Sequence, residues 1–121
     1  MLVRTLEDVT GTDGEAHGEK WHTMRLLQAE DGVGVSLTDC ILEAGFETTE
    51  WPERHPGACY CLEGEGSIED LRTGKVHRIK PGTLFALDAR DGQRIRASTR
   101  MRLICTFAAA RSTAETHKPG R

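Results

Sequence analysis

The sequence predicts an all-β fold, a sandwich or a small barrel that forms one domain over residues 1–121. Short runs rich in apolar and β-branched residues recur about every ten residues, and glycines separate them. No segment before the tail has a convincing helical pattern. The chain of 121 residues is 37% hydrophobic, which suits one compact core and excludes a second domain.

The strands are expected in a regular series along the chain. Residues 3–6 are predicted to form a short edge strand, and the Gly- and Asp-rich residues 10–17 a loop. Further strands are predicted at residues 21–27, 34–42, 46–51, 58–62, 67–70, 76–79, 83–87, 93–97 and 102–107. A short polar C-terminal tail follows the last of them.

Two turn sequences divide the series into halves. Residues 63–66, Glu-Gly-Glu-Gly, supply positions that tolerate positive φ, and residues 80–83, Lys-Pro-Gly-Thr, fit a type II turn. A hairpin is expected between them, around residues 72–74. This arrangement is typical of a small double-sheet barrel.

Charge and hydropathy argue against two classes of binding partner, nucleic acids and membranes. The formal net charge is −3 and neither sign forms a long run, so binding of nucleic acid or of an anionic membrane is not expected. The most apolar segment, residues 103–110, is far shorter than the ~18 residues of a membrane helix. The first residues lack the apolar core of a signal peptide, so a cytoplasmic location is expected.

Cys40, Cys59, Cys61 and Cys105 are expected to be reduced thiols, because disulfides are rare in the cytoplasm. Their spacing matches no usual zinc motif. They are either small core residues or functional thiols, and the sequence leaves both open.

Three segments carry a resemblance to a known family. They are YCLEGEG at residues 60–66, IKPGTLFALD at 79–88 and MRLICTF at 101–107. The whole chain resembles the ectoine synthase family of the cupin superfamily. The resemblance implies a single-domain cupin, a double-stranded β-helix or jelly-roll barrel, and a homodimer in which residues 3–6 could pair across subunits. It also implies ring closure, in which an amine attacks an acetamido carbonyl of the same small molecule and water leaves.

The resemblance further implies iron held by a Glu, a Tyr and a His. The corresponding positions of this chain are Gly57, Phe85 and Gln93. Glycine and phenylalanine have no donor atom, and an amide is a poor ligand for a transition metal. We therefore expect no cofactor and no metal at these positions, and authentic ectoine synthesis is expected to be improbable. His55 and Cys59 are the candidates for a rebuilt zinc or copper site.

The resemblance also implies a set of substrate-binding residues. It implies that Arg25 anchors a carboxylate and that Trp21 and Phe107 wall an apolar slot. Proton transfer is expected from Glu115, His117 or Cys105. If the family's ligand positions face inward, strand alternation places Cys59, Cys61, Cys105, Thr38 and Cys40 on the same lining. Phe85 and Gln93 complete the expected substrate-binding set.

Three functions remain open from the sequence. The first is an enzyme that binds a small carboxylate-bearing metabolite and promotes a metal-independent cyclisation, dehydration or related rearrangement, as in specialised metabolism. The second is a non-catalytic sensor or carrier of a small metabolite. The third is a metal site rebuilt on His55 and the cysteines.

Overall fold

The computed structural model describes residues 1–50, 57–87 and 92–108, and this part of the chain is almost entirely β-structure. A short helix, α1 (Leu6–Val9), and a 3₁₀ turn, η1 (Ala29–Asp31), accompany the strands. The strands are β1 (Glu15–His17), β2 (Trp21–Leu27), β3 (Val35–Leu42), β4 (Glu47–Thr48), β5 (Gly57–Glu63), β6 (Gly66–Asp70), β7 (Lys75–Ile79), β8 (Leu84–Leu87), β9 (Gln93–Ala97) and β10 (Met101–Ala108).

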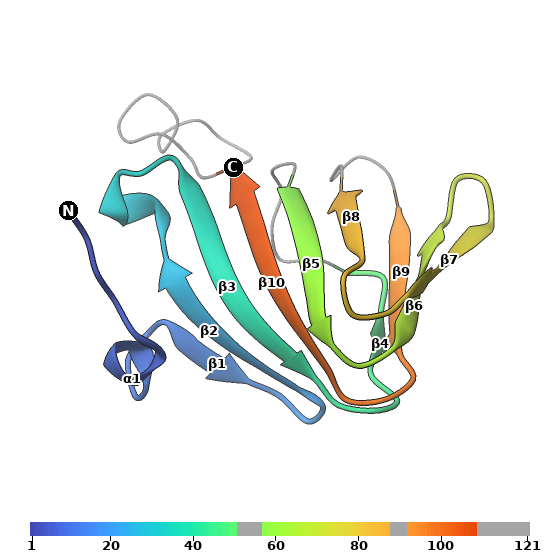
Figure 1. Cartoon of the computed structure of the whole chain (residues 1–121), viewed down its shortest axis with the longest axis horizontal. Coiled ribbons are helices and arrows are strands. Elements are labelled where there is room, and N and C mark those ends of the chain that lie inside the picture. The colour runs from blue at the N-terminus through green and yellow to red at the C-terminus, as the bar shows by residue number, and fades with distance from the viewer. Residues whose placement is uncertain (51–56, 88–91, 109–121) are drawn as a thin grey trace.

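The strands form two antiparallel sheets (Figure 1). The larger sheet has the order β1-β2-β3-β10-β5-β8, and the smaller sheet has the order β4-β9-β6-β7. From β3 onward the chain passes repeatedly between the two sheets, with only β6 and β7 consecutive in one sheet among the described strands, and β10 lies between β3 and β5. This is the all-β, double-sheet architecture that the sequence predicts.

The core lies between the facing sides of the two sheets. Alternate residues of β10 are buried, from Met101 to Phe107, because side chains two apart along a strand share a face. The smaller sheet contributes Ile68, Ile79 and Ile95 to the same cluster. We call these facing sides the inner faces of the sheets.

The predicted turns are confirmed. The backbone N–H of Thr83 donates to the carbonyl of Lys80 at 3.0 Å, and Gly82 has φ of +93°, as the third position of a type II turn requires. Gly64 has φ of +88°, and a Cβ there would overlap the carbonyl of Arg100. The backbone at both positions therefore needs glycine.

The predicted edge strand at residues 3–6 is wrong. The backbone N–H of Asp8 donates to the Thr5 hydroxyl, and the Asp8 carboxylate accepts from the Thr5 N–H, so the two residues cap α1 reciprocally. The predicted loop at residues 10–17 ends in strand β1. The strand predicted at 46–51 comprises only Glu47 and Thr48 within the described residues.

A buried carboxylate lies on the outer face of the larger sheet. Asp39 is 5% exposed, and it accepts two hydrogen bonds from the Arg102 guanidinium, at 3.0 Å from Nε and 2.6 Å from Nη2. The pair joins β3 to β10 with bidentate geometry.

None of the helical segments in the described part of the chain has the length and apolar character needed to cross a membrane.

Candidate functional site

The strand registers align the inner face of the larger sheet into three successive rows. The row nearest the start of β5 contains Ser36, Phe107, Gly57 and Leu87. The second row contains Arg25, Thr38, Cys105, Cys59 and Phe85. The third row contains Thr23, Cys40, Leu103 and Cys61. Partners in a row have side chains on the same face, so these rows define one continuous surface.

Within these rows, several positions of β3, β5 and β10 carry small side chains. We call this cluster the small-residue patch; it comprises Ser36, Thr38, Cys40, Gly57, Cys59 and Cys105. Further along the strands, the inner face carries the larger side chains of Leu42, Met101 and Leu103. The small-residue patch lies toward the end of the larger sheet where β5 begins and β10 ends (Figure 1).

The structure brings most of the predicted lining residues together. The patch holds Thr38, Cys40, Cys59 and Cys105, with Phe85 and Phe107 beside it in the first two rows. All four cysteines, Cys61 included, lie on the inner face, and none forms a disulfide. The shared face predicted from strand alternation is thus present.

Trp21 does not join this cluster. It pairs with Leu42, whereas Phe107 pairs with Ser36, six residues away along β3. Six residues of strand span about 20 Å, so the two rings do not wall one slot. Trp21 packs instead against the core beside Gly18, where a Cβ would overlap its indole.

Two of the thiols are held in the neutral form. Burial, with smaller contributions from Cys105 and Asp39, raises the pKa of Cys40 to about 12. Burial also raises the pKa of Cys61, whose Sγ donates to the Glu63 carbonyl at 3.3 Å. At neutral pH these two thiols are weak donors, and neither acts as a base or a nucleophile.

The positions implied for a metal do not provide a donor set. Gly57 lies against Phe107, and a Cβ at position 57 would overlap both the Phe107 ring and the Thr106 carbonyl. Phe85 offers no oxygen, and Gln93 lies on β9 of the smaller sheet, paired with Asp70. Among the described residues, no three His, Cys, Asp or Glu side chains are grouped to hold a metal ion. These residues do not fit an iron centre.

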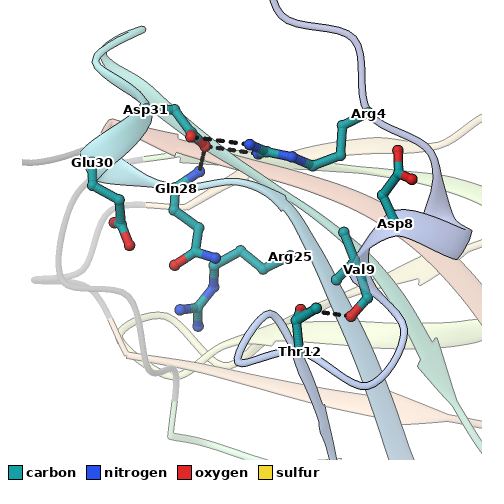
Figure 2. A pocket seen from close by; sticks show the side chains of 8 residues that line it. All are labelled: Arg4, Asp8, Val9, Thr12, Arg25, Gln28, Glu30 and Asp31. Carbon is teal, nitrogen blue, oxygen red and sulfur yellow. Dashed lines mark hydrogen bonds and ion pairs between the residues drawn. The ribbon is translucent and has the colours of Figure 1, made fainter.

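Arg25 connects the second row to a pocket at the edge of the larger sheet. This edge pocket, of about 290 Å³, is lined by Arg4, Asp8, Val9, Thr12, Arg25, Gln28, Glu30 and Asp31 (Figure 2). The Arg25 side chain is exposed, and its guanidinium has no hydrogen-bond or ion-pair partner among the described residues. A bulge in the pairing of β2 with β3 follows Arg25. Figure 2 shows the Arg25 guanidinium apart from the ion pair of Arg4 and Asp31.

On the opposite wall of the edge pocket, the charged groups of Arg4 and Asp31 pair with each other. Arg4 donates to both carboxylate oxygens of Asp31, at 2.9 and 3.2 Å, and to the Leu26 carbonyl at 2.6 Å. The Arg4 guanidinium, followed by the Gln28 N–H, lowers the pKa of the Asp31 carboxyl. Among the described residues, Arg25 is therefore the cation of this pocket that has no acidic partner and can bind an anion.

Three predicted residues cannot be placed. Glu115, His117 and His55 lie outside the described residues. Conversely, the sequence analysis missed Ser36 and the edge pocket. Ser36 lies two residues before Thr38 on the predicted strand, so strand alternation alone was sufficient to include it.

Comparison with known proteins identifies the family. The protein-family model described as ectoine synthase matches residues 1–120. A protein named L-ectoine synthase from Desulfosudis oleivorans is 48% identical over 97% of this chain and 92% of its own length. The crystal structure of ectoine synthase from P. lautus is 39% identical, with a TM-score of 0.82 over 97% of this chain and 84% of that one. An RmlC-like cupin from Shewanella frigidimarina, 21% identical, shares the fold with a TM-score of 0.66 over 81% of this chain and 84% of its own.

These comparisons overturn one expectation. The sequence analysis holds authentic ectoine synthesis improbable because three implied ligands are missing, yet relatives 44 to 48% identical over nearly the whole chain are named L-ectoine synthase. Three missing side chains therefore do not separate the chain from these enzymes. With a cupin fold and a match from end to end, the chain belongs to the ectoine synthase family.

Proposed function

We propose that this chain closes the ring for which its relatives are named, forming L-ectoine from an acetylated diaminobutyrate, without a metal ion at positions 57, 85 and 93. The observation that carries the proposal is the small-residue patch. Thr38, Cys59 and Cys105 lie in one row, with Arg25 at one end and the Phe85 ring at the other. A small amino-acid-derived molecule matches that combination of small side chains, cation and apolar wall.

Arg25 binds the substrate carboxylate. Its guanidinium can form two parallel hydrogen bonds with a carboxylate, and among the described residues no acid already occupies it. Fixing that end restricts the rotations of the chain that joins the amine to the acetamido group. Phe85 and Phe107 limit the folded conformers from the apolar side.

The reaction itself needs orientation and proton transfer. The amine nitrogen attacks the acetamido carbon, a carbon–nitrogen bond forms, and the carbonyl oxygen leaves as water with two protons that come from the substrate nitrogens. Both reacting groups belong to one molecule, so a shaped site raises the rate by holding the reactive conformer, for which effective molarities reach about 10⁵ M or more. No oxidant or second substrate enters the balance.

The proton-transfer groups that we propose are Cys105 and the pair Glu115 and His117. Cys105 lies in the second row, directly across from Cys59. Cys40 is excluded as a base because burial raises its pKa to about 12. Single alanine variants of Cys105, Glu115 and His117 should lower kcat more than they raise KM, because a proton-transfer group acts in the transition state.

The direct test is turnover of purified protein with the acetylated diaminobutyrate, followed by chromatography of the product, with and without a strong chelator. We expect L-ectoine in both conditions. Product that disappears with the chelator and returns with ferrous iron would refute the metal-independent part. Binding of the substrate without any product would identify a sensor or carrier instead.

A matched pair of variants tests the role of Arg25. Arg25→Ala should raise KM about 10- to 100-fold, because a charged hydrogen-bond pair contributes about 1.5–3 kcal/mol. Arg78→Ala is the control, because Arg78 is an exposed arginine of the smaller sheet that pairs with Glu65 at 3.0 Å, away from the small-residue patch. Equal KM values for the two variants would remove Arg25 from the site.

We also propose a homodimer. Residues 1–5 lie outside the helices and strands, and Leu2 and Val3 are 48% and 77% exposed. Pairing of this extended segment with a second copy would cover both side chains. Light scattering should give the mass of a dimer for the native protein and of a monomer for Val3→Asp; a monomeric native protein would reject the proposal.

A further inference from the structure

Ser36 is a buried polar side chain whose hydroxyl forms no hydrogen bond with the described residues. The residue is 7% exposed, and its Oγ has no hydrogen-bond partner in the part of the chain that the structure describes. Its backbone carbonyl is satisfied, because the Thr106 hydroxyl donates to it at 2.9 Å. Only the side-chain hydroxyl lacks a partner.

A buried hydroxyl without a partner is costly for the free protein, since folding removes it from water and returns nothing. Nearly all buried polar groups in proteins are paired, so an exception calls for a specific reason. One such reason is a ligand that supplies the missing partner. A core position that served packing alone would be served as well by alanine.

The location of Ser36 favours a ligand. Ser36 is the direct cross-strand partner of Phe107, on the inner face, at the end of the small-residue patch. Thr38, two residues further along β3, is the partner of Arg25. Ser36 is thus a diagonal neighbour of Arg25, at the spacing of about 7–8 Å that lets groups on adjacent strands contact one small molecule.

We infer that Ser36 is a substrate-binding residue, whose hydroxyl donates a hydrogen bond to an oxygen atom of the bound substrate. This inference rests on the proposed function, which supplies a substrate with a carboxylate and an acetamido carbonyl. Both groups accept hydrogen bonds, and a serine hydroxyl can donate to either. The contact orients the substrate next to the guanidinium that binds its charged end.

The test is Ser36→Ala, with Ser67→Ala as the matched control. Ser67 is a half-buried serine on β6, on the face of the smaller sheet opposite to buried Gly66 and Ile68. The readouts are the melting temperature of the free protein, the dissociation constant of L-ectoine by calorimetry, and kcat and KM for the acetylated diaminobutyrate.

We expect Ser36→Ala to melt at or above the temperature of the wild type, because it removes an unpaired hydroxyl from the interior. It should bind its ligand about five- to tenfold more weakly, the loss of one hydrogen bond. Ring closure removes the carbonyl oxygen and keeps the carboxylate. Weaker L-ectoine binding and a higher KM would therefore locate the contact at the carboxylate, whereas unchanged L-ectoine binding with a lower kcat would locate it at the carbonyl oxygen.

The outcomes separate the two proposals. A wild type that forms product, with Ser36→Ala kinetics and binding equal to those of Ser67→Ala, overturns the role of Ser36 alone. A Ser36→Ala variant that melts well below the wild type but binds and turns over normally also overturns it, since the hydroxyl is then structural. A wild type that binds L-ectoine without turnover, and more weakly after Ser36→Ala, supports Ser36 and refutes the catalytic proposal. Absence of both binding and turnover overturns both.

Discussion

Gly57 and Phe107 together determine what the end of the small-residue patch can hold, and Gly57→Ala perturbs them with one methyl group. The new Cβ would lie 2.6 Å from Cγ of Phe107 and would overlap the Thr106 carbonyl. Carbon atoms in contact are normally about 3.5–4.0 Å apart, so the ring must move by about 1 Å. The carbonyl belongs to β10 and cannot rotate away.

The size of the effect follows from two opposing contributions. Overpacking of a well-filled core costs about 1–3 kcal/mol, and the lower chain entropy of unfolded alanine returns about 0.4–1 kcal/mol. A net loss of about 1–2 kcal/mol remains. For a domain of this length each kcal/mol shifts the melting temperature by about 3–5 °C, so a decrease of about 3–10 °C is expected.

Thermal unfolding by circular dichroism measures this decrease. Gly92→Ala is the control, because the nearest atom to its Cβ would be Cδ1 of the Leu71 side chain, at 3.3 Å. A double-mutant cycle with Phe107→Ala isolates the clash with the ring. In the Phe107→Ala background, Gly57→Ala should destabilise the protein less, and the remaining loss of stability comes from the Thr106 carbonyl. The packing argument is refuted if Gly57→Ala has the melting temperature of the wild type, or if it lowers the melting temperature equally with and without the Phe107 ring.

Three further predictions concern charge and thiol chemistry. Arg102→Ala should destabilise the protein by about 2–3 kcal/mol in urea unfolding, because it leaves the buried Asp39 carboxylate unpaired. The partial exposure of Arg102 keeps this loss below the about 3–5 kcal/mol of a fully buried pair. Unchanged stability would contradict this expectation. The pKa of Asp31 is lowered in the folded protein, so its pairing with Arg4 stabilises the fold at pH values above 3.8, and this stabilisation is lost as the pH falls below 3.8. The stability of Arg4→Leu should therefore depend less on pH in this acidic range than that of the wild type. Identical pH profiles for the two proteins would contradict the sign of this effect. Cys40 should not react with a thiol reagent in the native protein at pH 8, because its pKa is near 12, whereas mass spectrometry after denaturation should find it modified; rapid native labelling would contradict its burial.

The strands and the sheet architecture were predictable from the sequence because the relevant signals are local. Alternation of buried and exposed side chains and the turn at Pro81-Gly82 are visible without tertiary contacts. Helix α1 was missed because four residues are too few to show helical periodicity, and its cap uses Asp8 where the usual signature has Glu or Gln. Apolar Val3 and Leu6 then suggested a strand.

The site was predictable in part for the same reason. Alternation put Thr38, Cys40 and Cys105 on one face, and the registers confirm that face. The distance between Trp21 and Phe107 was not predictable, because it depends on which residues pair across β2, β3 and β10. Strand alternation is sufficient to place Ser36 on this face, but the missing partner of its hydroxyl becomes visible only when the surrounding side chains are placed.

The central location of β10 has a consequence for biosynthesis. Its neighbours β3 and β5 are made much earlier, and each pairs with β10 along most of its length. Until residues 101–108 leave the ribosome, the larger sheet lacks its middle strand, and β3 and β5 present unpaired edges to the solvent. Completion of the larger sheet therefore follows the synthesis of residues 101–108. A nonsense or frameshift change just before residue 101 should yield an aggregation-prone fragment, because it removes the middle strand of that sheet.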